Sequence, residues 1–232
     1  MKTRNPSRQG NERESTAADK RRSAGVPPVP FVHRAPQIGI RARRLPHWEA
    51  TEATYFVTFR LADSLPREVL QQIEFQRKDI PATAAQMQRA LTGEERRRLA
   101  QQHSRMLERY LDAGAGRCWL SSAVVAGAVA DSLRKFDGTR YRLFAWCVMP
   151  NHVHVVFQTI AGNALSGILH SWKSFTAKKA NQILKRSGTF WQHEYYDLLI
   201  RDQAEFARAV VYVAENPQKA GLKEWDWVWI QK

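Results

Sequence analysis

Two histidines separated by one residue are the part of this chain best suited to chemistry. His152 and His154 lie in an apolar run typical of a β-strand, where side chains two residues apart point to the same face. Imidazole nitrogens bind divalent transition metals, so two of them on one face can hold one ion. The spacing therefore predicts a metal site on one face of a sheet.

A tyrosine and an asparagine near the C-terminus could complete this chemistry. Tyr212 and Asn216 lie four residues apart in a segment with helical periodicity, so we expect them one turn apart on one helix face. The pKa of a free tyrosine is about 10, so its attack on a phosphate at neutral pH needs assistance. A metal ion supplies this assistance by withdrawing negative charge from the phosphate. Together these residues indicate a nuclease that uses tyrosine as nucleophile.

Other interpretations of these residues stay open. Tyr212 alone would also suit a core aromatic on an amphipathic helix. Tyr195 and Tyr196 compete as nucleophiles, although their strand-like aromatic surroundings favour core or base-stacking roles. A structural zinc site with Cys147 is compatible with ligand type. However, its odd offset of five residues from His152 predicts a thiol on the opposite face of a regular strand.

The net charge favours polyanionic partners. The chain has 232 residues, enough for one domain with a substantial core, and a formal net charge of +14 with a pI near 10.2. Such a surplus strengthens binding to nucleic acids through phosphate contacts and release of counterions. A basic protein without a nucleic-acid partner is the alternative on charge alone.

Cysteine content and hydropathy predict where the protein acts. Two cysteines cannot form a disulfide framework, which fits a reducing cytoplasm. The chain has no apolar run of about 18 residues, so we expect no membrane-spanning segment. Its polar, arginine-rich start also lacks the apolar core of a secretory signal. We therefore expect a cytoplasmic protein, associated with the nucleoid if its partner is DNA.

Basic residues are concentrated at the N-terminus. Residues 1–46 contain 11 Lys and Arg against 3 Asp and Glu, more than half of the total charge surplus. We predict that residues 1–44 form a basic arm without fixed structure, and that Arg43 and Arg44 contact DNA. A solvated tail, or a start codon placed upstream of the true one, is the alternative. The folded domain is expected over residues 45–232.

The order of predicted elements defines a fold class. The expected strands cover residues 54–61, 141–149, 152–158 and part of 190–200, the second and third forming a hairpin. The expected helices cover residues 124–136, 165–185 and 203–216, the last closed by Pro217. A charged helical insertion is predicted over residues 67–113. This order predicts an α+β fold with a ferredoxin-like antiparallel sheet packed against helices.

Several motifs carry a family resemblance. The segments that carry it are 55–66, 149–157, 191–201 and 212–222, in this order. They resemble the REP-associated tyrosine transposases, which are insertion-sequence-200-like members of the HUH superfamily of single-strand transposases. The resemblance covers about residues 45–222 and is weaker over the insertion.

The resemblance implies a function and roles for individual residues. Such proteins cleave and rejoin single-stranded DNA beside palindromic hairpins through a covalent 5′-phosphotyrosine. On the matching positions, His152, His154 and Asn216 hold Mg²⁺ or Mn²⁺, and Tyr212 is the nucleophile. The family leaves open whether this protein is a monomer or a homodimer.

Three lysines are candidates for contacts with the substrate. Lys173, Lys178 and Lys179 lie on the polar side of the helix expected over 165–185, where they form either a phosphate track or a solvated face.

A catalytically silent, hairpin-binding regulator is the main alternative function, although it would not need all four site residues. A hydrolytic nuclease without a covalent intermediate is the other, but no cluster of acidic residues stands out for it.

Deleting residues 1–40 tests whether the basic arm contacts DNA. We expect the truncated protein to bind single-stranded DNA with a shallower dependence of affinity on salt, because fewer counterions are released. Binding titrations at several salt concentrations measure this slope. A slope equal to that of the full-length chain would exclude the arm as a DNA contact.

Overall fold

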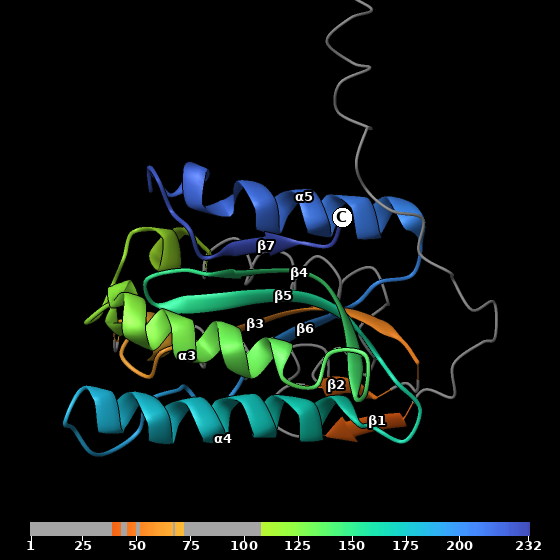
Figure 1. Ribbon diagram of the computed structural model, residues 1–232, viewed down its shortest axis with the longest axis horizontal. Coiled ribbons are helices and arrows are strands. Elements are labelled where there is room, and N and C mark those ends of the chain that lie inside the picture. The colour runs from red at the N-terminus through yellow and green to blue at the C-terminus, as the bar shows by residue number, and fades with distance from the viewer. Residues whose placement is uncertain (1–38, 43–45, 50–51, 67, 72–107) are drawn as a thin grey trace, which may run out of the picture.

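The computed structural model describes most of the chain after residue 107 and shorter segments before it (Figure 1). The described residues are 39–42, 46–49, 52–66, 68–71 and 108–232. Arg43 and Arg44 therefore lie outside the described residues, as does most of the predicted insertion at 67–113. Residues 68–71 and 108–112, at the ends of that segment, are helical, and the insertion as a whole stays a prediction.

A five-stranded antiparallel sheet forms the centre of the molecule. Its strands are β3 (Thr54–Arg60), β4 (Tyr141–Val148), β5 (His152–Thr159), β6 (Tyr196–Leu199) and β7 (Val228–Ile230). They lie in the order β6-β3-β5-β4-β7, and every neighbouring pair is antiparallel.

The connections confirm the predicted ferredoxin-like class. Helix α3 (Ala123–Arg134), preceded by the short 3-10 helix η1 (Trp119–Ser121), connects β3 to β4, and α4 (Leu165–Ile183) connects β5 to β6. The unit is thus β-α-β-β-α-β, with its fourth, first, third and second strands side by side. Strand β7 extends the sheet beyond β4.

The helices cover both faces of the sheet. Helices α3 and α4 lie together on one face, and α5 (Gln203–Lys219) lies on the other (Figure 1). Side chains alternate accordingly along β3: Tyr55 and Val57 pack toward α3 and α4, whereas Phe56 packs in the core beneath α5. Strand β5 is buried on both faces, which explains its nearly continuous apolar sequence.

The predicted hairpin between β4 and β5 is confirmed. The two strands pair antiparallel from Tyr141–Thr159 to Val148–Val153, with one irregularity between Leu143 and Ala145. The backbone N–H of Met149 donates to the carbonyl of His152 at 2.8 Å and closes the turn. His152 is therefore the first residue of its strand.

Two boundaries differ from the sequence-based expectation. Pro217 does not end α5, which continues to Lys219. Backbone hydrogen bonds continue past Pro217: the Ala220 N–H donates to the Asn216 carbonyl, and the Leu222 N–H donates to the Pro217 carbonyl. A proline this close to a helix end interrupts few intrahelical bonds. The expected strand within 190–200 is limited to β6, since the preceding residues form only an isolated bridge between Leu61 and Trp191.

A small separate sheet precedes the main one. Strand β1 (Gly39–Ala42) pairs antiparallel with β2 (Pro46–Glu49). Strand β1 lies within the arm predicted over residues 1–44, so paired structure begins before the expected domain boundary. None of the helices in the described part of the chain combines the length and apolar character needed to cross a membrane.

Candidate active site

The two histidines meet on the face of the sheet that α5 covers. His152 and His154 are both 1% exposed, and their ring centroids are 4.5 Å apart at a steep interplanar angle of 80°. Their Nε2 atoms approach to 2.9 Å. The strand pleat thus turns both imidazoles the same way, as the spacing predicted.

Asn151 fixes the tautomer of His152. Its side-chain amide donates from Nδ2 to the Ala115 carbonyl at 2.9 Å, which leaves Oδ1 facing His152 Nδ1 at 2.7 Å. Because an amide oxygen only accepts, His152 Nδ1 must carry the proton. The lone pair of His152 therefore lies on Nε2, the atom that faces His154.

Thr58 on the neighbouring strand contacts the second ring. Its Oγ1 lies 2.8 Å from His154 Nδ1, and the two residues are opposite each other in the β3–β5 register. A hydroxyl can donate or accept, so either nitrogen of His154 can carry the proton. In one tautomer His154 Nε2 donates to His152; in the other, both Nε2 lone pairs face the same point.

Burial keeps both rings uncharged. It lowers the pKa of His154 to about 3. The pKa of His152 is lowered well below its usual value by burial and then by the neighbouring His154. Both imidazoles are therefore neutral at pH 7, the state in which imidazole binds a metal ion.

Tyr212 on α5 contacts His154, and Asn216 interacts with Tyr212. The Tyr212 ring centroid is 5.2 Å from that of His154 and 5.6 Å from that of Phe56. Asn216, one turn later, is 1% exposed. Asn216 Oδ1 has no hydrogen-bond partner in the described part of the chain, whereas the Tyr212 phenol interacts with the side chains of Glu108 and Asn216. A buried polar atom without a partner is costly, so this amide oxygen is suited to a ligand that enters the site.

The described end of the insertion reaches this site. Burial raises the pKa of Tyr212 above its usual value, and the charges of Glu108 and Asp112 raise it further. These two acids lie on the helical turn 108–112, about a hundred residues before the tyrosine in the chain. The phenol is consequently neutral in the resting protein. Sequence analysis missed this contact because helical periodicity does not reveal which distant element a charged face meets.

The donor set suits a divalent ion. His152, His154 and Asn216 offer two imidazole nitrogens and one buried amide oxygen, a set that leaves coordination positions open for substrate. Among the described residues, no three His, Cys, Asp or Glu side chains gather in one place. Asn216 as a third donor stays a prediction, and a two-metal acidic centre has no support in the described part of the chain.

Cys147 is placed differently from the prediction. It lies opposite His154 in the β4–β5 register and packs in the core beneath α5, so its expected position on the other face is wrong. The count of five residues from His152 passes through the hairpin turn, where strand alternation does not hold. Burial nevertheless raises the thiol pKa to about 12, which keeps Cys147 protonated and disfavours zinc binding.

The competing tyrosines lie farther from the histidines. Tyr196 on β6 is opposite Thr58, two strands away from His154, which is about 10 Å. The ring of Tyr195 contacts the Lys173 ammonium at 5.7 Å. Of the three candidates, Tyr212 is the one whose ring contacts His154.

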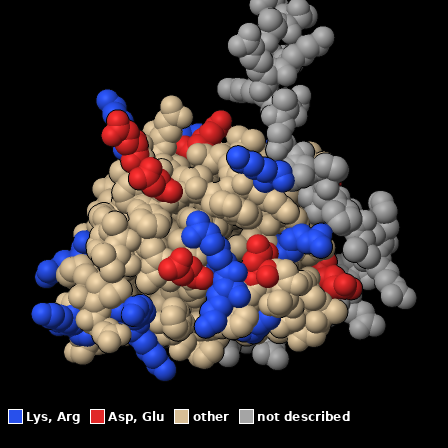
Figure 2. Space-filling view, in the orientation of Figure 1, with Lys and Arg blue, Asp and Glu red and all other residues tan. Residues whose placement is uncertain are grey.

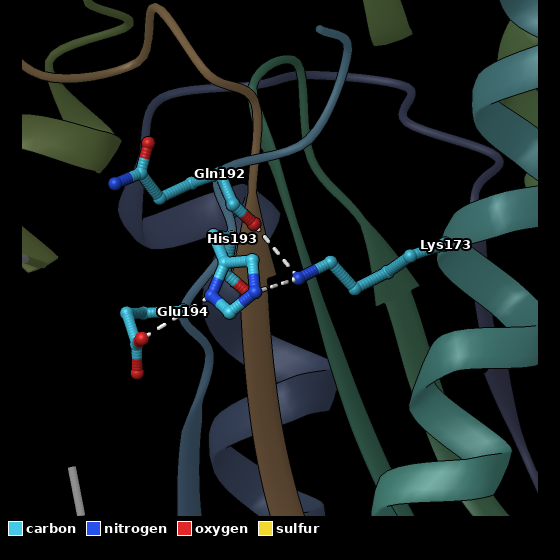
Figure 3. A network of polar contacts seen from close by, with 4 residues as sticks. All are labelled: Lys173, Gln192, His193 and Glu194. Atoms are coloured by element: carbon cyan, nitrogen blue, oxygen red, sulfur yellow. Dashed lines mark hydrogen bonds and ion pairs between the residues drawn. The ribbon is translucent and has the colours of Figure 1, made fainter. Parts of the chain in front are cut away.

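Lys173 is engaged within the protein. Its Nζ donates to the carbonyls of Gln192 and His193 at 2.7 and 2.6 Å (Figure 3). Burial is the main cause that lowers its pKa to about 8. Lys173 therefore holds the segment that follows α4, and a contact with DNA at this position remains a prediction.

The other basic candidates are more accessible. Lys178 and Lys179 are exposed on α4. Basic side chains gather over the C-terminal end of this helix, at the lower left of Figure 2, while basic and acidic side chains mix elsewhere on that face. Helix α4 covers the face of the sheet opposite the histidines, so these lysines are not direct neighbours of the Nε2 pair. Their role in binding DNA also remains a prediction.

Comparison with known proteins indicates the class. Residues 128–216 match the family model described as "Transposase IS200 like". This segment contains both histidines, Tyr212 and, as its last residue, Asn216. Over these residues the chain is similar to the IS200-like transposases.

Individual relatives narrow the comparison. A curated protein of Haemophilus influenzae (strain Rd), named "Putative REP-associated tyrosine transposase", is 28% identical over 101 residues. The match covers 38% of this chain and 57% of that relative. A solved REP-associated tyrosine transposase bound to a REP hairpin is 16% identical with a TM-score of 0.44, over 81% of each chain. The predicted resemblance to the REP-associated tyrosine transposases is confirmed.

The neutral histidine pair makes stability depend on pH. In the presence of a metal chelator, we expect the free energy of unfolding to fall as pH drops below about 6.5. The two histidines are protonated in the unfolded chain at such pH, whereas in the folded protein the buried rings stay neutral. The slope reaches about 1.4 kcal/mol per pH unit for each such histidine. Urea unfolding between pH 7.5 and 4 measures it.

The double variant His152→Gln/His154→Gln is the control for this pH dependence. It lacks both rings, so its stability should fall less over the same pH range, while carboxylates elsewhere affect both proteins equally. Parallel curves for the two proteins would show that the rings are not buried in the neutral state.

Proposed function

We propose that this protein is a single-strand DNA transposase that cleaves and rejoins hairpin-bearing DNA through Tyr212. The observation that carries the proposal is the convergence of Tyr212 on His154, 5.2 Å between ring centroids, next to the facing Nε2 atoms. The family match over the same residues and the name of the curated relative support it.

His152, His154 and Asn216 would hold a divalent ion, Mg²⁺ or Mn²⁺. Nitrogen donors suit Mn²⁺ better than Mg²⁺, so we expect tighter binding of Mn²⁺. When bound, the ion would withdraw charge from the phosphate and orient it for in-line attack. Asn151 and Thr58 would support the site by forming a hydrogen bond with the second nitrogen of each ring.

Tyr212 would form the covalent intermediate. Its Oη attacks the phosphorus, the bond to the 3′ oxygen breaks, and the tyrosine retains the 5′-phosphate. The phenol proton is lost and the leaving 3′ oxygen gains one, so the products are a phosphotyrosine and a free 3′-hydroxyl. A 3′-hydroxyl can reverse the attack, and strand transfer therefore needs no external energy source.

Other parts of the chain would contribute to binding. Lys178 and Lys179 are exposed cations that suit the DNA backbone, and Arg43 and Arg44 would add to it from the arm. The hairpin is the proposed recognition element, and single-stranded DNA of the nucleoid in the cytoplasm is the proposed substrate. A monomer and a homodimer are both compatible with this proposal.

Two other functions have less support. A hairpin-binding regulator would not need a neutral histidine pair in contact with a buried tyrosine. A hydrolytic nuclease would leave no DNA on the protein, and the described residues offer it no cluster of carboxylates. The experiment on Tyr212 below separates all three.

Asn151→Ala should weaken Mn²⁺ binding. Without the amide, His152 Nδ1 loses its acceptor, and its lone pair is no longer confined to Nε2. Loss of such a supporting contact reduces metal affinity by about 10- to 100-fold. Calorimetric titration of the DNA-free protein measures this. His152→Ala should abolish the binding, and Asn163→Ala, at the N-terminus of α4, should not change it. Wild-type affinity in His152→Ala would rule out the metal site.

Tyr212→Phe should abolish the covalent DNA adduct. We would incubate both proteins with labelled single-stranded hairpin DNA and Mn²⁺, then separate them on a denaturing gel. Label should stay with the wild type and with the matched variant Tyr196→Phe, and be absent from Tyr212→Phe. An adduct that survives in Tyr212→Phe would assign the nucleophile elsewhere. Cleavage without any adduct would favour the hydrolytic nuclease, and binding without cleavage the regulator.

A further inference from the structure

Arg60 is a basic residue beside the histidines to which no role has been assigned. It is the last residue of β3 and lies opposite His152 in the β3–β5 register. The Leu61 N–H donates to the Asn151 carbonyl at 2.8 Å, so Arg60 and His152 form a pair without mutual backbone bonds. Side chains in such pairs share a face, with Cβ atoms about 4.5–5.5 Å apart.

The charge of this arginine is poorly compensated. Arg60 is half-buried, and burial lowers its pKa to about 10, so it remains a cation at pH 7. It forms no ion pair with any described residue, and its side-chain hydrogen bond is a long one, 3.4 Å from Nη1 to Ser64 Oγ. Holding a desolvated cation without an anion is costly, which indicates that an anion completes this site.

A second cation, Lys173 on α4, is electrostatically coupled to Arg60, although α4 covers the opposite face of the sheet. The pKa of Lys173 is lowered mainly by burial, is partly restored by Glu194, and is lowered again by the charge of Arg60. Lys173 already donates to two carbonyls, whereas the guanidinium of Arg60 has donors to spare. Arg60 is thus the side chain here with capacity for a further ligand.

We propose that Arg60 binds a phosphate of the DNA strand immediately beside the histidine pair. That the anion is a DNA phosphate rests on the proposed function. A guanidinium donates two parallel hydrogen bonds to a phosphate, and a partly dehydrated site strengthens them. Its position next to His152 would orient the strand relative to Tyr212 before any bond breaks.

DNA binding measured without catalysis tests this site. Every protein would carry Tyr212→Phe, and the buffer would contain chelator, so that neither the nucleophile nor a metal ion contributes. The probe is a single-stranded oligonucleotide with a hairpin. Added Arg60→Met should weaken binding about 10- to 100-fold, the range for a hydrogen-bonded charge. It should also make the salt slope shallower by about 0.7, the value for one phosphate on a single strand.

Arg142→Met is the matched control. Arg142 is exposed and lies opposite Gln158 on the same face, six residues along β5 from His152, or about 20 Å. Its loss removes the same charge from the same sheet face but should leave the affinity close to that of the parent. Arg60→Lys should lie between parent and Arg60→Met, because it keeps the charge and loses the paired donors.

A phosphate scan identifies the contact. Replacing single phosphates by neutral methylphosphonates should weaken binding to the parent protein at one position near the cleavage point. The same replacement should have no further effect on Arg60→Met. Additive losses in the two experiments would overturn the proposal, since they would show that Arg60 and that phosphate act independently.

Thermal unfolding separates a binding role from a structural one. Arg60→Met should leave the melting temperature unchanged or raise it, because it removes a half-buried charge that has no ion-pair partner among the described residues. A marked fall, or a variant that does not fold, would assign Arg60 a structural role. Parent-like affinity and salt slope in Arg60→Met would also overturn the proposal. If no covalent adduct forms but Arg60→Met binds weakly, the transposase proposal fails and the phosphate site stands.

Discussion

The antiparallel pairing of β3 with β5 is the constraint on which the rest of the site depends. Seven consecutive residues of β3 pair in one register, which sets Thr58 against His154 and Arg60 against His152. A slip by one residue would turn both partners to the opposite face. Val153 between the histidines, and Val155 and Phe157 after them, hold this register because they must remain in the core beneath α3 and α4.

The site places polar groups where the sheet would otherwise be apolar. His152, His154 and Asn216 are almost completely buried, and each ring nitrogen that faces away from the centre has a hydrogen-bond partner. The atoms that face the centre are the facing nitrogens, a free amide oxygen and a phenol. Hydrogen-bond partners thus stabilise the outer nitrogens of the two rings. The atoms at the centre of the site retain the capacity to bind a ligand.

Much of this arrangement could be predicted from the sequence, because it depends on short-range periodicity. The histidine spacing, the hairpin and the helical pair of Tyr212 and Asn216 follow from two-residue and four-residue repeats. The partnership of Thr58 with His154 could not be predicted, since it depends on a register between strands 96 residues apart. Cys147 was misplaced for a related reason: alternation was counted through a turn.

The helix that carries Tyr212 connects the two outer strands of the sheet. It follows β6 at one edge and precedes β7 at the other. It runs along β4, β5 and β7 and packs over these strands, so its contacts lie toward the β7 edge of the sheet (Figure 1). Exchange of this helix between two copies of the chain would require β7 to separate from β4. Under the proposed function, transfer of a DNA end on Tyr212 to a second copy of the chain would therefore carry the cost of breaking the β4–β7 pairing.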